Sequence, residues 1–267
     1  MKKFAALVLA MMLLVTAGVA LAEDASVQAI QDKGIMVLGL DDSFPPMGYR
    51  DEAGEIVGFD IDVAKEVAVR LGVELTLQPI EWAAKELELA SGNIDCIWNG
   101  MSITEERQAS MSMTFSYMNN QILFYATKAA ALTSLEDLAG KKIAVQGGSF
   151  AEELLNSDTY ADLKNSFAEV LSFEEYLTAL MDLEQGGVDA VLIDKVVAEY
   201  RIAGMGVDDI VPVIALEDDN FGVGFRKEDV ALRDKVQELL IEMKKDGALG
   251  EISTTWFGSD ITSVPAE

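Results

Sequence analysis

Apolar runs of strand length alternate with helical patterns along most of the chain. Residues 35–40 (IMVLGL) form a continuous apolar run, which is typical of a buried strand. In residues 60–71 the apolar side chains recur at helical spacing, and Gly72 follows as a helix end. The same rules predict strands at 75–80 and 96–98, a helix at 83–90 and a polar hairpin at 49–56. This alternation predicts an α/β fold with helices covering a parallel sheet.

A second α/β cycle begins at residue 122. Its predicted strands are 122–126, 142–145 and 190–193, and its predicted helices are a short one capped at Ser134, one ending at Leu155, and those at 176–185 and 195–203. A strand at 221–225 and a helix with one apolar stripe follow. The chain therefore has two α/β cycles, and we assign its tail to the first.

The N-terminal residues have the pattern of a cleaved export signal. Lys2 and Lys3 precede an apolar run at 4–15, and residues 20–22 (ALA) are the small-x-small pattern that signal peptidase recognises. The run is shorter than the ~20 residues that cross a bilayer. We therefore predict cleavage after Ala22. Because no cysteine near the cut could carry a lipid, we expect the mature protein to be soluble in a periplasm.

Composition excludes several classes of function. The formal charge of −26 becomes −28 when Lys2 and Lys3 leave with the leader, which argues against nucleic acid and anionic membranes as partners. The chain has no histidine, so Ser-His and Cys-His catalysis and most transition-metal sites are excluded. Cys96, the one cysteine, lies in an apolar stretch and is predicted to be a buried structural thiol. We expect no catalytic residue, no metal and no cofactor.

Candidate binding residues stand where predicted strands end, which is where open α/β sheets bind ligands. Asp41 and Phe44 follow the first strand, and residues 99–107 (NGMSITEER) follow the third. In that second segment a helix start and Arg107 suit a carboxylate. In the second cycle Gly147-Gly148-Ser149 precedes a helix, and Asp194 ends a strand. Each residue also has a plainer interpretation as a solvated acid, a helix cap or a surface cation.

Taken in order, several stretches resemble the family 3 solute-binding proteins of bacteria, which serve ABC transporters for polar amino acids. They are residues 58–64 (GFDIDVA), 102–107 (SITEER), 188–194 (VDAVLID) and 256–258 (WFG). The resemblance implies a type II periplasmic-binding fold, in which two α/β lobes are joined by two crossover strands. The division it implies is signal peptide 1–22, lobe 1 at 23–117 and 221–267, and lobe 2 at 118–220. The crossings should fall near 117–121 and 218–221.

The resemblance also implies roles for the residues at both poles of an amino acid. Arg107 is similar to the residue that clamps the α-carboxylate, with help from Ser102 and from the backbone near Asn99 and Gly100. Ser149 resembles the hydroxyl that joins the clamp from lobe 2. Asp194 resembles the acceptor of the α-ammonium.

The residues around the ligand side chain follow in the same way. Phe44 and Trp82 match the aromatic positions that sandwich the side chain, and Asp41 matches the position that reads its distal end. Asp41, Asp42 and Glu81 favour a cationic side chain, whereas Gln146 and Asn99 equally suit an amide. The chain departs from the family pattern at Phe150, after Ser149, and at Asn99-Gly100, so the identity of the ligand does not carry over.

Three functions remain after these arguments. The first is a monomeric periplasmic protein that delivers a polar L-amino acid to the membrane permease subunits of an ABC importer, without catalysis. The second is an enzyme of the same fold, such as a dehydratase, with Glu81 or Asp42 as its acid or base. The third is a receptor's sensor module, which is disfavoured because no membrane span or signalling domain follows.

Overall fold

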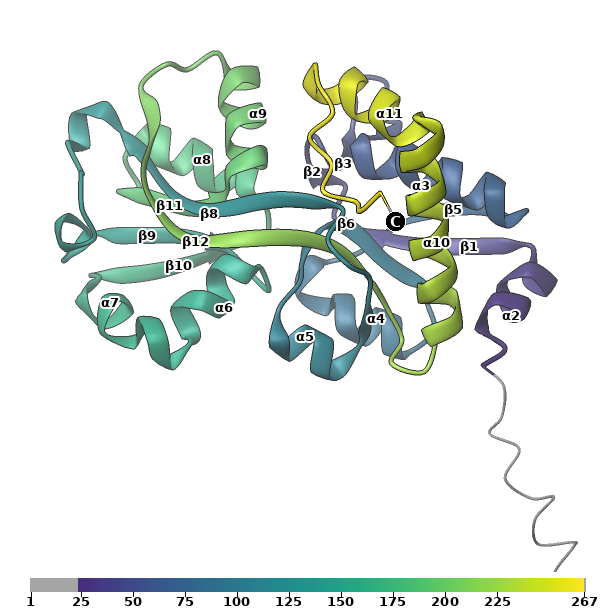
Figure 1. The fold of residues 1–267 in the computed structure, drawn as a ribbon. Coiled ribbons are helices and arrows are strands. Elements are labelled where there is room, and N and C mark those ends of the chain that lie inside the picture. The colour runs from purple at the N-terminus through teal and green to yellow at the C-terminus, as the bar shows by residue number, and fades with distance from the viewer. Residues whose placement is uncertain (1–23, 267) are drawn as a thin grey trace, which may run out of the picture.

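The computed structural model describes residues 24–266, so the predicted leader and its cleavage after Ala22 lie outside the described residues. Two halves lie side by side and are joined by two long strands, β8 (Met118–Thr127) and β12 (Ile210–Phe225) (Figure 1). Both strands belong to a nine-stranded sheet of order β10-β9-β11-β8-β12-β6-β1-β5, with β7 paired to β12. Among these residues no helix has the length and apolar composition needed to cross a membrane. The predicted α/β fold is confirmed.

We call residues 24–117 and 221–266 lobe 1 and residues 118–220 lobe 2, following the division predicted from the sequence. In lobe 1, β1 is flanked by the parallel strands β5 and β6, and β2, β3 and β4 form a separate three-stranded sheet. The elements of lobe 1 are α2 (Ser26–Lys33), β1 (Ile35–Leu40), β2 (Ser43–Phe44), β3 (Gly48–Arg50), β4 (Ile56–Val57), α3 (Phe59–Leu71), β5 (Glu74–Pro79), α4 (Lys85–Ala90), β6 (Cys96–Ser102), α5 (Glu105–Ser110), β7 (Ser112–Met113), α10 (Val230–Asp246) and α11 (Ala248–Phe257).

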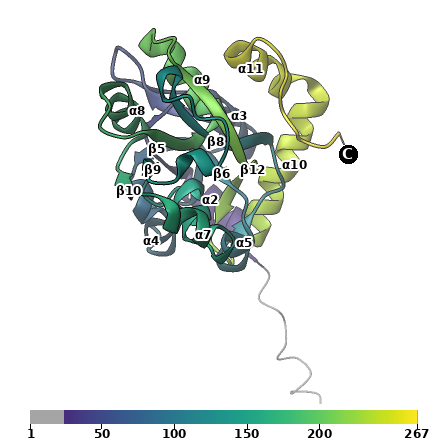
Figure 2. The same cartoon turned by 90° about the vertical axis from the view of Figure 1, so that its left-hand side faces the viewer.

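Lobe 2 repeats this plan around β9, which pairs in parallel with β10 and β11. Viewed along the long axis of the molecule, helices lie on both sides of the strands (Figure 2). Besides the two joining strands, the elements of lobe 2 are β9 (Lys142–Gln146), α6 (Phe150–Asn156), α7 (Ala161–Ser166), β10 (Glu169–Phe173), α8 (Tyr176–Gln185), β11 (Ala190–Asp194) and α9 (Lys195–Met205).

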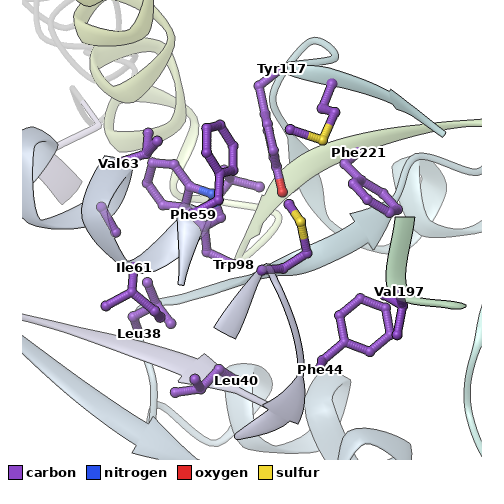
Figure 3. Packing of buried hydrophobic residues seen from close by; sticks show 14 of the residues in the cluster. Leu38, Leu40, Phe44, Phe59, Ile61, Val63, Trp98, Tyr117, Val197 and Phe221 are labelled. Atoms are coloured by element: carbon purple, nitrogen blue, oxygen red, sulfur yellow. The ribbon is translucent and has the colours of Figure 1, made fainter. Parts of the chain in front are cut away.

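Helix α3 shows how the sequence pattern forms the core of lobe 1. Its apolar face, which includes Ile61, Val67 and Leu71, is fully buried, and Gly72 ends the helix in the left-handed conformation. The helix packs on β5 and β6 and contacts α10 and α11, so the C-terminal helices pack on the core of lobe 1. In the interior, aromatic residues at the start of α3, on β6 and on the joining strands lie close together (Figure 3).

The antiparallel pairing of β8 with β12 connects the lobes. Met118 pairs with Phe221 and Gln121 with Asp218, so residues 118–121 and 218–221 run side by side. Strand β12 pairs with β6 of lobe 1, and β8 pairs with β11 of lobe 2. Hydrogen bonds therefore continue from one lobe to the other without a break in the sheet.

Three features differ from the sequence prediction. Strand β6 continues to Ser102, where Phe221 pairs with it, so residues 99–102 lie inside a strand and not after one. The joining strands are longer than the predicted 122–126 and 221–225 because each pairs with the other over the crossing. Six of the named elements were not predicted, namely α2, β2, β7, α7, β10 and α11.

Gly100 occupies a crowded position in the middle of β6. Its φ is +59°, and a Cβ atom there would lie 2.7 Å from Cε1 of Phe44. Its amide donates to the buried carboxylate of Asp60 at 2.7 Å, and the Tyr117 hydroxyl donates to the same oxygen at 2.8 Å. Burial raises the pKa of Asp60 to about 7. The glycine therefore lets Phe44 and the end of β6 pack closely at the inner edge of lobe 1.

This crowding predicts the effect of Gly100→Ala. The new methyl group must displace Phe44, and the alanine must keep the positive φ of the glycine. The variant should therefore lose about 1–3 kcal/mol of unfolding free energy. Gly92→Ala is the matched control, because Gly92 also has a positive φ, +75°, but has no atom within 4 Å of the new Cβ. Urea unfolding of both variants tests this, and an equal loss in the two would contradict the steric account.

Candidate ligand-binding site

The two lobes meet along a cleft whose walls carry the ends of the parallel strands. Asp41 follows β1, Gln146 ends β9 and Asp194 ends β11, so three predicted site residues reach the cleft from strand ends. All three side chains are buried. In both lobes, buried polar residues therefore lie where parallel strands end.

Asp41 and Gln146 bond directly across the cleft. Nε2 of Gln146, from lobe 2, donates to Oδ2 of Asp41 at 2.7 Å and to the carbonyl of Glu174. On the lobe 1 side, Oδ1 of Asn99 accepts the amide of Asp41, so Asn99 positions this residue from behind. Burial raises the pKa of Asp41 to about 6, partly offset by the bond from Gln146. A hydrogen-bond donor or a cation beside the buried Asp41 therefore stabilises the charged form of its carboxylate.

Beside Asp41 lies a pocket of about 220 Å³. Its lining comprises Asp41, Asp42, Pro79, Ile80, Glu81, Trp82, Glu174 and Glu175. Five of these residues are acids and none is basic, and one of the acids, Asp42, is paired with Arg50 at 2.6 Å, so the lining has a surplus of acidic groups. It can hold a cation with an aromatic ring at its wall.

Arg107 is held at the end of helix α5, where only 4% of its side chain is exposed. Thr104 caps the helix by accepting the amide of Arg107, as its plainer interpretation predicted. The guanidinium donates through Nη1 to the carbonyl of Ser102 and through Nη2 to Glu153 of lobe 2, at 3.0 and 2.6 Å. Its Nε is buried without a partner in the protein. A cation in this position can bind a carboxylate, for which Glu153 competes.

A second buried cation, Lys85, was missed by the sequence prediction. It begins α4, lies 5.1 Å from the centroid of the Trp82 ring, and donates to the carbonyl of Gly148 across the cleft at 2.8 Å. Burial lowers its pKa, and nearby Arg107 adds to this effect. Ser149 follows as the cap of α6, its hydroxyl accepting the amide of Glu152. Both lobes thus contribute polar groups to the part of the cleft in which Arg107 and Lys85 lie.

The acidic end lies at the crossing of the joining strands. Nδ2 of Asn120, on β8, donates to Oδ1 of Asp194 at 2.7 Å and to Oδ2 of Asp219, on β12, at 2.9 Å. The hydroxyl of Ser102 donates to that same oxygen of Asp219 at 3.0 Å. Asp194 is the N-cap residue of α9 but makes no side-chain cap bond, so the plainer interpretation as a helix cap is not supported. Burial raises the pKa of Asp194 to about 8, and the charge of Asp219 adds to it.

The aromatic residues are distributed differently from the predicted sandwich. Phe44 packs on Tyr176 of lobe 2, with ring centroids 6.1 Å apart, and Trp82 packs in a separate apolar cluster that includes Leu89 and Ile97. The hydroxyl of Tyr176 is buried without a protein partner. Phe44 and Tyr176 therefore form an apolar contact between the lobes, while Trp82 lines the acidic pocket.

Most predicted site residues meet in this cleft, with two qualifications. The Gly100 amide is bonded to Asp60, so in this conformation it is not available to a ligand carboxylate. The Ser102 hydroxyl is bonded to Asp219 instead of pointing at the Arg107 guanidinium. Sequence reasoning missed Lys85, Asn120, Glu153, Tyr176 and Asp219, which lie on helices and joining strands and not in the strand-end loops that were searched.

Two α/β lobes joined by an antiparallel pair of crossing strands, with buried charges of both signs between them, define a two-lobed binding protein. Residues 36–259 match the family described as bacterial extracellular solute-binding proteins, family 3. The chain belongs to this family. The resemblance found in its sequence is confirmed, as is the type II periplasmic-binding fold that the resemblance implies.

Several known proteins are similar to the chain over most of its length. The L-cystine-binding protein TcyJ of Escherichia coli K12 is 28% identical over 90% of this chain and 89% of its own. A substrate-binding protein of an ABC uptake transporter from Streptococcus pneumoniae, solved with bound histidine, is 36% identical with a TM-score of 0.86, and the match covers 91% and 99%. An ancestral amino-acid-binding protein, a precursor of cyclohexadienyl dehydratase, is 30% identical with a TM-score of 0.79, over 87% and 99%. These relatives are named as binding proteins and not as enzymes.

The contact between Arg107 and Glu153 predicts the effect of Glu153→Gln. Removing the carboxylate frees Nη2 of Arg107, so the affinity for an amino acid should rise about threefold to tenfold, modest because 31% of the Glu153 side chain is exposed. Glu106→Gln removes an exposed charge from the same helix as Arg107 and serves as the control. Calorimetric titration of both variants provides the measurement. A lower affinity in Glu153→Gln would show that the ion pair holds the binding conformation and does not compete with the ligand.

Proposed function

We propose that this protein is the substrate-binding component of an amino-acid ABC importer and that it binds a polar L-amino acid with a basic or amide side chain between its lobes. The observation that carries this proposal is the separation of charge along the cleft. Arg107 lies at one end with a buried, unpartnered Nε, and Asp194 lies with Asp219 at the crossing strands. A zwitterion matches this arrangement, because its carboxylate and its ammonium need opposite partners.

The acidic pocket beside Asp41 supports a basic side chain over a neutral one. Five acids line it and no cation does, and the Trp82 ring forms part of its wall. In that pocket Asp41 would bind the distal cation or amide of the ligand, displacing or sharing the bond from Gln146. The histidine bound by the S. pneumoniae relative is consistent with such a ligand.

The proposed location and partners follow from the family and the leader. We propose export, cleavage after Ala22 and residence in the periplasm as a soluble monomer. The membrane partner would be the permease subunits of an ABC transporter. None of these steps needs catalysis, so we propose no reaction and no cofactor.

A thermal-shift screen against the common amino acids and L-cystine tests the proposal. A ligand at 100 times its dissociation constant adds ~2.7 kcal/mol to the stability of the folded protein, which is a readily measured shift. Arg107→Ala should lose about 2–5 kcal/mol of binding free energy, and Arg107→Lys should also fail, because an ammonium does not reproduce the two-nitrogen fork. A wild-type protein stabilised by no amino acid would overturn the function, and unchanged binding by Arg107→Ala would overturn the role of Arg107.

Binding should be coupled to closure of the lobes. The proposed carboxylate partner lies in lobe 1 and the proposed ammonium acceptor in lobe 2, so neither lobe alone satisfies both poles of the ligand. The ligand therefore favours the closed conformation, in which contacts such as Phe44–Tyr176 and the bond from Lys85 to the carbonyl of Gly148 also form.

Small-angle X-ray scattering measures this closure. Saturating ligand should reduce the radius of gyration of the protein, because the lobes approach each other around β8 and β12. The free protein with its lobes already together in solution, or an unchanged radius despite calorimetrically confirmed binding, would contradict ligand-driven closure.

A further inference from the structure

Two buried acids at the crossing strands share one amide. Nδ2 of Asn120 lies 2.7 Å from an oxygen of Asp194 and 2.9 Å from an oxygen of Asp219, so the two carboxylates cannot be farther apart than these distances together. The side chains of Asp194 and Asp219 belong to residues only 5% and 4% exposed. Two carboxylates this close and this buried repel each other unless a cation or a proton lies between them.

The protein itself supplies little compensation for this charge. The Ser102 hydroxyl and the Asn120 amide donate to Asp219, and Arg107 is the charged side chain of opposite sign that acts on both acids. The other titratable groups near them are the phenols of Tyr117 and Tyr176, which do not carry positive charge, and the exposed Lys195, which lines a surface pocket together with Asn120 and Asp219. The two acids therefore lack a cation of their own at short range.

Two acceptor atoms of this cluster are left without a donor. Oδ1 of Asp219 and Oδ1 of Asn120 are both buried and have no hydrogen-bond partner within the protein. A buried acceptor without a donor costs free energy, and such groups in native structures mark a position that another molecule satisfies. Together with the carboxylate of Asp194, the cluster contains three acceptor groups that are linked through the Asn120 amide at the crossing strands.

We propose that Asp219 and Asn120 complete the ammonium subsite, so that a primary ammonium with three N–H donors is held by two carboxylates and one amide oxygen. This inference rests on the proposed function, in which Asp194 accepts the α-ammonium. It adds Asp219 as a specificity-determining residue: the subsite selects a full positive charge, and it selects primary amines over secondary or tertiary amines and over hydroxyl groups.

The paired acids also make ligand binding at this subsite depend on pH. Burial raises the pKa values of Asp194 and of Asp219, Asp194 to about 8. In the free closed protein the pair therefore holds a proton near neutral pH. The ammonium stabilises both carboxylates in their charged form, so binding should release a proton, and affinity should fall as the pH drops below the pKa of the free pair.

The test uses the full mature protein and whichever of L-histidine, L-arginine, L-glutamine and L-cystine binds it most tightly. Asp219→Asn should weaken that binding about 10- to 100-fold, as expected for a lost hydrogen bond to a charged group. Asp218→Asn is the matched control, because Asp218 is the preceding residue on the same strand but is exposed and bonds Gln121. Titrations in phosphate and in Tris, whose ionisation enthalpies differ, give the number of protons released, which should be smaller in Asp219→Asn than in wild type.

The outcomes separate this proposal from the proposed function. Wild-type affinity in Asp219→Asn overturns the role of Asp219 while leaving amino-acid binding intact. A weaker affinity with unchanged proton release also overturns it, because Asp219 would then act only through the geometry of the strands. Proton release by the wild-type protein is a test that does not depend on the folding of a variant. If ligand binding releases no proton between pH 6 and 8, the paired-acid subsite is contradicted. If none of the four amino acids binds, this inference fails, whereas the proposed function fails only if no amino acid in the thermal-shift screen stabilises the protein.

Discussion

The antiparallel ladder between β8 and β12 is the constraint on which the rest of the structure depends. It is the segment of the sheet that belongs to both lobes, pairing with β6 on one side and β11 on the other. Because successive side chains of a strand point to opposite faces, the ladder also decides which polar residues of the crossing face the cleft. Asn120 and Asp219 are cross-strand partners and act together, whereas Gln121 and Asp218 form the neighbouring, exposed pair. The connection between lobes and part of the binding chemistry thus come from the same few residues.

The charges in the cleft depend on which ionisable groups are buried there and not on the net charge of the chain. The surplus of acids over bases is spread over the surface, where solvent and salt screen it. In the cleft Asp41, Asp194 and Asp219 are buried, so their pKa values rise, while the cations Arg107 and Lys85 are also buried there. The net charge is therefore only weak evidence for a preference for cations. The positions of the individual buried groups are more informative about the ligand.

Local pattern predicted the elements whose apolar faces pack within one lobe. The helix at 176–185 was predicted to the residue, because its burial follows from helical spacing alone. The long strands β8 and β12 were predicted only in part, since the pairing that extends them joins segments about a hundred residues apart. For the same reason residues 99–102 were expected to follow β6 and not to lie within it.

The same limit applies to the site. Arg107 and Asp194 were predicted as site residues because they stand near element ends, where a sequence rule directs attention. Asp219 lies in the run EDDN and Asn120 in the run MNNQ, both of which resemble solvated polar segments. Nothing in the local sequence distinguishes buried Asp219 from exposed Asp218. The distinction comes from the register of β12 against β8, which is a tertiary property.

The closed arrangement explains why a ligand is needed to hold it. Contacts between the lobes, such as the bond between Gln146 and Asp41 and the pair of Phe44 with Tyr176, favour closure without any ligand. Closure also buries Asp194 and Asp219 together, which opposes it. Shifting a population from 1:99 to 99:1 closed requires ~5.5 kcal/mol of differential affinity, and micromolar binding supplies about 8 kcal/mol in total. An ammonium placed between the two acids, which both belong to lobe 2, acts on the unfavourable part of this balance, and its attraction to them is strongest in the closed arrangement, where lobe 1 shields them from water and Ser102 donates to Asp219.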